Sequence, residues 1–408
     1  MSILVAVSFV LLAVGLFGLA ASAFQAFLTW WYVRQGPKLQ SSQPGISILK
    51  PLCGVDDGLE KNLELFATLP YPNYELLLGV KNEKDPAYPL AVAATQRWPD
   101  RVRLYLQRGE PGLNPKVNQL CTLQDQARFD LLLISDSNCR PFPGYLEEIA
   151  AEFEDPQVAC VTNPIVGVGE QKLGSLLDNF HLGSTIASGM IAAKLAPIPH
   201  DIVVGKSMAL RKSALLALGG FYAARNHLAE DYVLGRGIHD QLGMKIAHCK
   251  LPVVQISQNR TLRDFLNRQK RWCVIHRTAI AWYTYVGEGL MSVTPWVLLG
   301  ALLNPTPQNA LLFLAVWAAK SSLDALNTRQ FRPVLFGAMT PVYALLKDLI
   351  WTTAWAYGLF VRTVTWRGNK LVVQAGSQLI PPTPELLPLP LPAPVAEPAY
   401  VPQERHVA

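Results

Sequence analysis

The sequence predicts an α/β domain with a mostly parallel central sheet, flanked by membrane segments near both ends of the chain. Short β-rich runs alternate with helix-like runs through the middle of the chain, a pattern typical of a parallel sheet covered by helices. The chain of 408 residues is 50% hydrophobic and only 16% charged. A soluble enzyme usually carries about 25% charged residues, and here the deficit lies towards the two ends.

Residues 1–33 are predicted to form a retained membrane anchor. Ile3 to Leu28 carries no charged residue and exceeds the roughly 20 residues that a helix needs to cross a bilayer. No basic region precedes this run, which is also too long for a signal peptide. An aromatic cluster at 30–32 and then Arg34 and Lys38 follow it. Because positive charge is retained on the cytosolic side, this order places the next domain in the cytosol.

Residues 34–258 are predicted to form that cytosolic domain. The expected strands are Ile46–Leu49, Tyr74–Val80, Val102–Leu106 and Leu131–Ile134, and the expected helices are Leu59–Leu69, Ala87–Trp98 and Val117–Ala127. Parallel sheets bind ligands at the carboxyl ends of their strands. Asp85 and Asp136 follow two of these strands, so we expect both carboxylates at that edge of the sheet.

Carboxylates at a strand end suit a divalent metal that neutralises a diphosphate, or hydrogen bonds from a ribose or a uracil. No GxGxxG motif precedes either aspartate and no complete P-loop occurs, which disfavours dinucleotide and ATP folds. An aspartate in this position is also a common helix cap or turn residue. The two residues therefore carry weight only in combination with others.

A third acidic site is the adjacent pair Glu230 and Asp231. Transfer of a group to an alcohol needs a base that takes the hydroxyl proton. Because the two residues are neighbours, we expect only one of them to point into a site. The alternative is an acidic helix start without a catalytic role.

Residues 259–286 predict a basic amphipathic helix at the membrane interface. The segment from Arg260 to Arg277 holds six Lys or Arg residues and one acid. Apolar side chains at helical spacing would face a membrane surface, and the guanidinium of Arg271 would suit a departing diphosphate. The net charge of +6 is modest, and the densest basic run directly precedes an apolar segment. This favours a phosphate ligand or anionic headgroups over nucleic acid.

Residues 287–365 are predicted to form C-terminal membrane segments. Leu290–Leu303 and Ala310–Ala319 are individually short and together predict a hairpin, whereas Pro333–Val361 is long enough for one tilted span. Lys347 and Asp348 lie in the middle of that span, where such charges are expected to face protein or a polar cavity. The alternative is two re-entrant helices that meet at this pair, and the side of the C-terminus stays open. Residues 366–408 form a tail, predicted to be proline-rich and disordered from residue 380.

The six cysteines are scattered, without a close pair. This spacing predicts neither a disulfide framework nor a zinc site, and it fits a reducing, cytosolic environment.

The order of strand–Asp, strand–Asp, Glu-Asp and Arg-x-x-Arg-Trp (Arg268–Trp272) resembles processive and lipid-linked glycosyltransferases related to family 2. Further motifs narrow the resemblance to the ceramide glucosyltransferase family, glycosyltransferase family 21, from about residue 45 to residue 370. These motifs are Ser47–Leu52, Gly54–Asp56, Tyr71-Pro72, Asp85–Ala87, Asn114–Asn118, Asp136-Ser137, Ala229–Tyr232 and Trp366–Gly368.

The resemblance implies a GT-A fold that uses a UDP-sugar. Asp231 would be the base of an inverting displacement, and Asp136 would bind the ribose and, through Mg²⁺ or Mn²⁺, the diphosphate. Asp85 would contact the uridine, and Pro51 would border the nucleobase. The donor-binding residues would be Pro51, Asp85, Lys116, Asn118, Asp136 and Arg271, and the acceptor-binding residues would be Trp272, Glu230 and Arg268.

This sequence departs from the family in ways that concern the metal, the sugar and the lipid. The second motif is Asp-Ser-Asn rather than Asp-x-Asp, so metal binding would rest on Asp136. Lys206 stands where the animal enzymes of the family have an apolar residue, and the segment 181–190 lacks their His-Pro pair. Together with the proline-rich tail, these departures point to a divergent, bacterial member.

The leading interpretation is therefore an integral membrane enzyme that transfers glucose from UDP-glucose to the primary hydroxyl of ceramide, giving β-glucosylceramide. Its partners would be a UDP-sugar, a membrane lipid and the bilayer, with no nucleic acid. One alternative keeps the chemistry but has a hopanoid or diacylglycerol as the acceptor, or UDP-GlcNAc as the donor. A processive polysaccharide synthase usually needs more transmembrane helices. An inactive membrane protein is disfavoured by the retention of the aspartates and of the Arg268–Trp272 motif.

Overall fold

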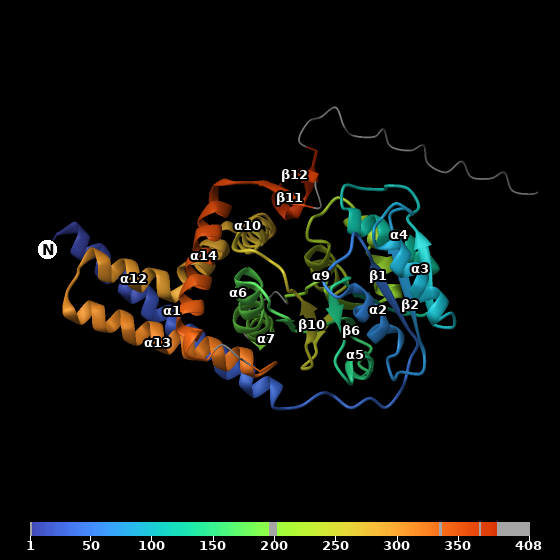
Figure 1. The fold of residues 1–408 in the computed structure, drawn as a ribbon, viewed down its shortest axis with the longest axis horizontal. Helices are drawn as coiled ribbons and strands as arrows, with labels where there is room; N and C mark the ends of the chain where they lie inside the picture. The colour runs from blue at the N-terminus through green and yellow to red at the C-terminus, as the bar shows by residue number, and fades with distance from the viewer. Residues whose placement is uncertain (1, 196–201, 334–336, 367–368, 382–408) are drawn as a thin grey trace, which may run out of the picture.

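The computed structural model describes residues 2–195, 202–333, 337–366 and 369–381. Arg367 and Gly368 of the last motif and the tail beyond Pro381 lie outside these residues. Figure 1 shows the sheet at one end of the molecule and helices α1, α12 and α13 at the other, with α6, α7, α10 and α14 between them.

A seven-stranded sheet in the order β3-β2-β1-β4-β8-β6-β9 forms the centre of the globular part. Its strands are β1 (Ile46–Pro51), β2 (Tyr74–Val80), β3 (Val102–Leu106), β4 (Leu131–Ser135), β6 (Val158–Thr162), β8 (Ser207–Arg211) and β9 (Lys245–His248). Only β8 runs antiparallel to its neighbours, and the other pairs are parallel. The predicted mostly parallel sheet is confirmed, and the four expected strands correspond to β1–β4.

Helices cover both faces of this sheet. They are α2 (Leu59–Ala67), α3 (Tyr88–Arg97), α4 (Pro115–Gln126), α5 (Tyr145–Glu152), α8 (Lys212–Ala217) and α9 (Glu230–Asp240). Ile48 packs into the core on one face of the sheet and Leu49 into the core on the other, because successive side chains of a strand point in opposite directions. The three expected helices are confirmed as α2, α3 and α4.

A second layer connects the sheet to the long helices. It contains the small sheet of β5 (Cys139–Arg140), β7 (Ile165–Val168) and β10 (Val253–Ile256), then α6 (Leu173–His181), a π-helical turn (Leu182–Ala187) and α7 (Ser188–Leu195). Helix α10 (Leu262–Ala279) starts with a capping box, in which Thr261 and Asp264 bond to each other's backbone N–H. It packs against α6 and α14 (Thr340–Phe360), and a C-terminal sheet of β11 (Thr363–Trp366), β12 (Asn369–Val373) and β13 (Leu379–Ile380) follows.

Two helices of the described chain are long and apolar enough to cross a membrane, α1 (Ile3–Val33) and α13 (Pro307–Arg329). Helices α11 (Trp282–Leu290) and α12 (Val293–Leu303) meet at an angle of 66° and together have the length and composition of one broken span. Helices α1, α12 and α13 pack side by side (Figure 1). A Cβ atom on Gly15 of α1 would lie 2.2 Å from Cγ2 of Val297, so this close helix contact depends on glycine.

The structure corrects two expectations for the C-terminal membrane segments. Ala310–Ala319 is part of the 23-residue helix α13, which continues through Lys320 to Arg329. The alternative of two helices that meet at Lys347-Asp348 is wrong, because α14 is continuous over Thr340–Phe360. Helix α14 is not among the candidate spans of the described residues.

The charged side chains that interrupt these apolar helices neutralise one another. Lys347 Nζ lies 2.8 Å from Asp348 Oδ1 and 3.1 Å from Asp324 Oδ2, and Lys320 Nζ lies 2.5 Å from Asp324 Oδ1. Thr294 of α12 donates a hydrogen bond of 2.9 Å to Asp348. The expectation that the Lys347-Asp348 pair faces protein is confirmed, and the cluster joins α12, α13 and α14.

Replacement of Lys347 by Met should lower the melting temperature of the detergent-solubilised protein. The change leaves the buried carboxylates of Asp324 and Asp348 with Lys320 as their one remaining shared cation, and removal of one partner of a buried ion pair costs roughly 3–5 kcal/mol. Thermal unfolding measures the effect. The matched control is Arg329→Met, which removes an exposed cation from α13 and should change stability by no more than about 0.5 kcal/mol. Equal melting temperatures for the two variants would contradict a structural role for Lys347.

Candidate active site

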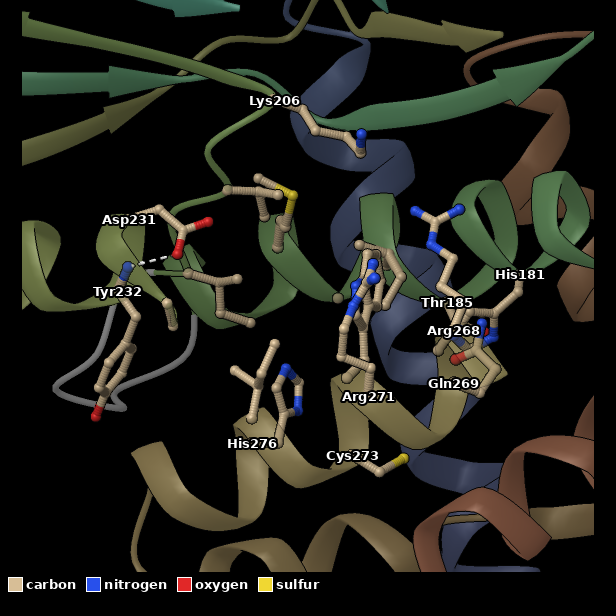
Figure 2. A pocket seen from close by; sticks show the side chains of 18 of the residues that line it. His181, Thr185, Lys206, Asp231, Tyr232, Arg268, Gln269, Arg271, Cys273 and His276 are labelled. Carbon is tan, nitrogen blue, oxygen red and sulfur yellow. Dashed lines mark hydrogen bonds between the residues drawn. The ribbon is translucent and has the colours of Figure 1, made fainter. Parts of the chain in front are cut away.

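One cavity of about 1100 Å³ lies between the carboxyl ends of the sheet strands, helix α10 and the long helices. Asp136 and Lys206 line it from the sheet, Arg271 lines it from α10, and Gly18 and Gln25 line it from α1. Figure 2 shows Lys206, Asp231 and Arg271 around this space. The cavity therefore joins the polar edge of the sheet to a helix that is long and apolar enough to cross a membrane.

Asp136 follows β4 and is held by three lysines. Its Oδ1 lies 3.0 Å from Lys116 Nζ, and its Oδ2 lies 2.9 Å from Lys206 Nζ. Lys50 of β1, which is fully buried, donates to the backbone carbonyl of Asp136 at 2.7 Å and to Ser135 Oγ at 3.1 Å. Burial raises the pKa of the Asp136 carboxyl, but the ammonium groups of Lys116 and Lys206 hold it well below its usual range. Asp136 is therefore a fixed carboxylate.

Lys116 connects Asp136 to the acidic pair at the start of α9. It stands in the first turn of α4, whose N-terminus is capped by Asn114 through hydrogen bonds from the N–H groups of residues 116 and 117. Besides Asp136, its ammonium lies 2.7 Å from Glu230 Oε1 and donates to the Gly205 carbonyl at 3.0 Å. Desolvation lowers the pKa of Lys116, but the Asp136 and Glu230 carboxylates raise it on balance, so the lysine stays charged.

Asp231 lies in the first turn of α9, beside Glu230. Its Oδ2 accepts a hydrogen bond of 2.7 Å from Gly205 N, and its Oδ1 accepts one of 2.8 Å from Tyr232 N. Burial and the neighbouring Glu230 carboxylate raise the pKa of Asp231 to about 6. Both members of the pair line the cavity, so the expectation that only one of them does so is wrong. They differ in their partners, because Glu230 is paired with Lys116 whereas Asp231 accepts hydrogen bonds from backbone N–H groups.

Gly205 permits this close arrangement. A Cβ atom at this position would lie 2.8 Å from Lys116 Nζ and 3.0 Å from Glu230 Oε1. A side chain at this position would displace the charged ends of Lys116 and Glu230 from their present contacts. The absence of a side chain is therefore what lets the backbone of this loop bond to both Lys116 and Asp231.

Helix α10 supplies the opposite wall of the cavity. Arg268 is buried, forms an ion pair with Asp178 of α6 and donates to Gln255 Oε1 at 3.0 Å. Its guanidinium carbon lies 4.5 Å from the centre of the Trp272 ring. In Figure 2, the Arg271 side chain extends from α10 into the cavity. Arg268 therefore braces this wall of the cavity, and Arg271 projects from it.

The structure brings most of the predicted site residues to this one cavity. Those that line it are Pro51, Lys116, Asp136, Glu230, Asp231, Arg268, Arg271 and Trp272. Asp85 and Asn118 lie outside this lining. Asp85 Oδ1 accepts hydrogen bonds from Gly54 N at 2.9 Å and Ala87 N at 2.8 Å, and Asn118 exchanges two hydrogen bonds with the backbone of Gly112. These two side chains hold the loops beside the cavity.

Lys206 and His276 are among the polar residues of the cavity that were not predicted as site residues. Lys206 precedes β8, which is the antiparallel strand that the alternating pattern does not predict. His276 lines the cavity four residues after Trp272, the spacing that puts two side chains on one helix face. Desolvation lowers the pKa of His276, but Glu288, with Oε2 3.3 Å from Nδ1, and Asp231 raise it on balance.

The residues around Asp136 do not form a ready metal site. Asp136 is the carboxylate to which the sequence assigned the metal, and an ammonium group engages each of its oxygens. Within the ranges that the structure describes, no group of three or more His, Cys, Asp or Glu residues is arranged to hold a metal ion. A divalent ion at Asp136 would have to share the carboxylate with two ammonium groups.

Comparisons with known proteins agree with the resemblance found in the sequence. The family model described as glycosyl transferase family 21 matches residues 10–379. Ceramide glucosyltransferase 3 of Caenorhabditis elegans is 27% identical over 85% of this chain and 76% of its own length. Ceramide glucosyltransferase 1 of the same organism is 28% identical over 82% of this chain and 73% of its own length.

Among solved structures, a mannosyltransferase from Pyrobaculum calidifontis in complex with GDP-Man and Mn²⁺ matches with a TM-score of 0.46 and 18% identity, over 86% of this chain and 96% of that chain. The family model matches residues 10–379, which is most of the chain. The protein therefore belongs to glycosyltransferase family 21, and it is a membrane-associated hexosyltransferase with a GT-A catalytic domain.

Proposed function

We propose that the enzyme transfers glucose from UDP-glucose to the primary hydroxyl of ceramide at the cytosolic face of a membrane, giving β-glucosylceramide. The observation that carries the proposal is the single cavity that links Asp231 and Asp136 to helix α1. A water-soluble donor and a membrane lipid have to meet in one space, and this cavity has a polar end and a membrane-helix end. The two similar proteins from Caenorhabditis elegans, both named ceramide glucosyltransferases, support transfer of glucose to ceramide.

The donor would occupy the polar end of the cavity. Pro51 would border the nucleobase, while Asp85 and Asn118 would act through the loops that they hold beside it. The guanidinium of Arg271 would stabilise the departing UDP, because its planar fork matches phosphate oxygens. Lys116 and the Asp136 carboxylate would keep the side chains at the polar end of the cavity in position through their ion pair of 3.0 Å.

Asp231 would act as the base. It would take the proton from the primary hydroxyl of the lipid while the hydroxyl oxygen attacks the anomeric carbon. The bond from that carbon to the diphosphate would break, and UDP would leave with the bonding electron pair. Attack from the face opposite the leaving group converts an α-linked donor into a β-glycoside. A pKa raised to about 6 keeps Asp231 ionised at neutral pH and makes it more basic than an ordinary aspartate.

The acceptor would approach along α1 and reach Asp231 beside Trp272, Glu230 and the buried Arg268. The gap between α1 and α10 is part of the same cavity, so the lipid head would enter without leaving the membrane side. Arg34 and Lys38, which follow the aromatic end of α1, support a cytosolic position for the catalytic domain.

A Mg²⁺ or Mn²⁺ ion at Asp136, as the resemblance implies, would neutralise the donor diphosphate when bound. The structure offers such an ion one carboxylate that two ammonium groups already engage. None of the steps above depends on a metal.

Purified full-length enzyme in mixed micelles should produce glucosylceramide from UDP-glucose and ceramide, as detected by mass spectrometry of the extracted lipids. Diacylglycerol, a hopanoid alcohol and UDP-GlcNAc, supplied in separate reactions, test the alternative acceptors and the alternative donor. Product from one of these, with none from ceramide and UDP-glucose, would replace the proposed substrates while leaving the reaction class intact. NMR of the product checks its β configuration.

Asp231→Asn should lower the rate of transfer by at least about 100-fold, since loss of a general base typically costs 10² to 10⁴ in rate. UDP binding, measured by isothermal titration calorimetry, should stay within about threefold of the wild type. Asp240→Asn, at the exposed end of the same helix, is the matched control and should keep full activity. If Asp231→Asn retained wild-type turnover, another group would have to be the base.

The rate of transfer should depend on the ionisation of Asp231. Because the base acts as its carboxylate, the rate should rise about tenfold per pH unit below pH about 6 and level off above it. Glu230→Gln removes the carboxylate charge that helps to raise the pKa of Asp231. The ammonium group of Lys116, which lowers this pKa, stays in place. The inflection should therefore move to lower pH in this variant. A shift to higher pH, or an unchanged profile, would exclude the coupling between Glu230 and Asp231.

A further inference from the structure

The two ammonium groups on Asp136 have different numbers of hydrogen-bond acceptors. Lys116 Nζ has three partners, Asp136 Oδ1 at 3.0 Å, Glu230 Oε1 at 2.7 Å and the Gly205 carbonyl at 3.0 Å. An ammonium group has three N–H donors, so Lys116 is saturated within the protein. Lys206 Nζ has two partners among the described residues, Asp136 Oδ2 at 2.9 Å and Asn138 Oδ1 at 3.3 Å. Lys206 keeps one N–H donor for a ligand.

Lys206 is placed to offer that donor to the cavity. It lines the cavity, and 12% of its side chain is accessible. In Figure 2, the side chains of Lys206 and Arg271 extend toward the same part of the cavity from opposite sides. Lys206 follows Gly205, whose N–H bonds to Asp231 at 2.7 Å. A phosphate bound to Lys206 would therefore lie close to the loop that holds the proposed base.

The charge at Asp136 equals that of a carboxylate with a bound divalent cation. One carboxylate and the ammonium groups of Lys116 and Lys206 sum to one positive charge, as do one carboxylate and Mg²⁺ or Mn²⁺. Lysine is a recognised phosphate ligand that acts as a point charge.

We infer that Lys206, supported by Lys116, supplies the positive charge that the donor diphosphate needs, so that a nucleoside diphosphate binds to this enzyme without a divalent cation. Asp136 then orients the two lysines instead of holding a metal, and Lys206 is the direct phosphate ligand. This inference rests on the proposed UDP-sugar donor and adds how its diphosphate is neutralised. Metal occupancy at Asp136 is the competing arrangement, because a metal and the lysines would contend for the same two oxygens.

The first test is UDP binding to the purified full-length protein by isothermal titration calorimetry, once in EDTA and once in MnCl₂ or MgCl₂. We expect dissociation constants that agree within about threefold under the three conditions. Binding that disappears in EDTA and returns with either metal would overturn the inference. Such a result would leave the proposed glucosyl transfer standing, because lipid product would still form in the presence of the metal.

Variants of Lys206 provide the second test. Lys206→Met should weaken UDP binding in EDTA by roughly 10-fold or more, the size expected for loss of a hydrogen bond to a charged group. Lys206→Arg keeps the charge and should remain within a few-fold of the wild type. In Lys206→Met the freed Asp136 oxygen becomes available to a cation, so Mn²⁺ should restore part of the lost affinity. The matched control is Lys245→Met, which removes an exposed lysine from β9 in the same sheet.

The outcomes separate the two proposals. Wild-type affinity of Lys206→Met in EDTA would overturn the role of Lys206, whatever the activity of the enzyme. Absence of UDP binding by the wild type with and without metal would overturn the proposed donor, and the lysine assignment with it. Melting temperatures of all variants, measured in the same detergent, distinguish loss of a phosphate contact from loss of the fold.

Discussion

The ion-pair network around Asp136 is the interaction on which the arrangement of the active site depends. It joins four segments that are distant in sequence: the end of β4, the start of α4, the loop before β8 and the start of α9. Lys116 is at its centre, with contacts to Asp136, Glu230 and Gly205 of 2.7–3.0 Å. Charged groups that are largely removed from water need partners, so each of these segments is constrained by the others. The position of Asp231 follows, because the loop that bonds to Lys116 also donates its N–H to Asp231.

Helix α10 connects the active site to the membrane helices. On one side it braces the catalytic domain through the buried contacts of Arg268 with Asp178 and Gln255, and on the other it packs along α14. Helix α14 is in turn tied to α13 and α12 by the Lys347–Asp324 and Thr294–Asp348 contacts. Loss of one charge from such a pair would leave its partner buried without compensation, so these contacts tie the three helices together. The cavity between α1 and the sheet thus has walls that are fixed from both ends.

Local patterns in the sequence predicted a large part of the fold. The strands β1–β4 and the helices between them follow from the alternation of β-rich and helix-like runs, and α1 follows from its uninterrupted apolar stretch. The bounds of the C-terminal helices were harder to predict from the sequence, because Lys320, Lys347 and Asp348 interrupt the apolar pattern and suggest helix ends. In the structure Lys347 pairs with Asp324, and Lys320 with Asp348, across α13 and α14, so both helices continue past these charges. A pairing between different helices leaves no mark in the hydrophobicity of either one.

The sequence by itself determined the family, the reaction class and most of the predicted residues that line the cavity, since Asp136, Glu230-Asp231 and Arg268–Trp272 occur in the order of a known motif. Only the tertiary structure decided what these residues do to one another. It placed Asp85 and Asn118 outside the cavity lining, where they hydrogen-bond to neighbouring loops, and it brought Lys206 onto Asp136, 70 residues away in the chain. The physical reason is that the field at a carboxylate depends on which charges lie within a few ångströms of it, and this distance is set by the packing of separate segments. A motif names the groups, whereas packing determines whether a carboxylate faces a metal ion, a lysine or a second carboxylate.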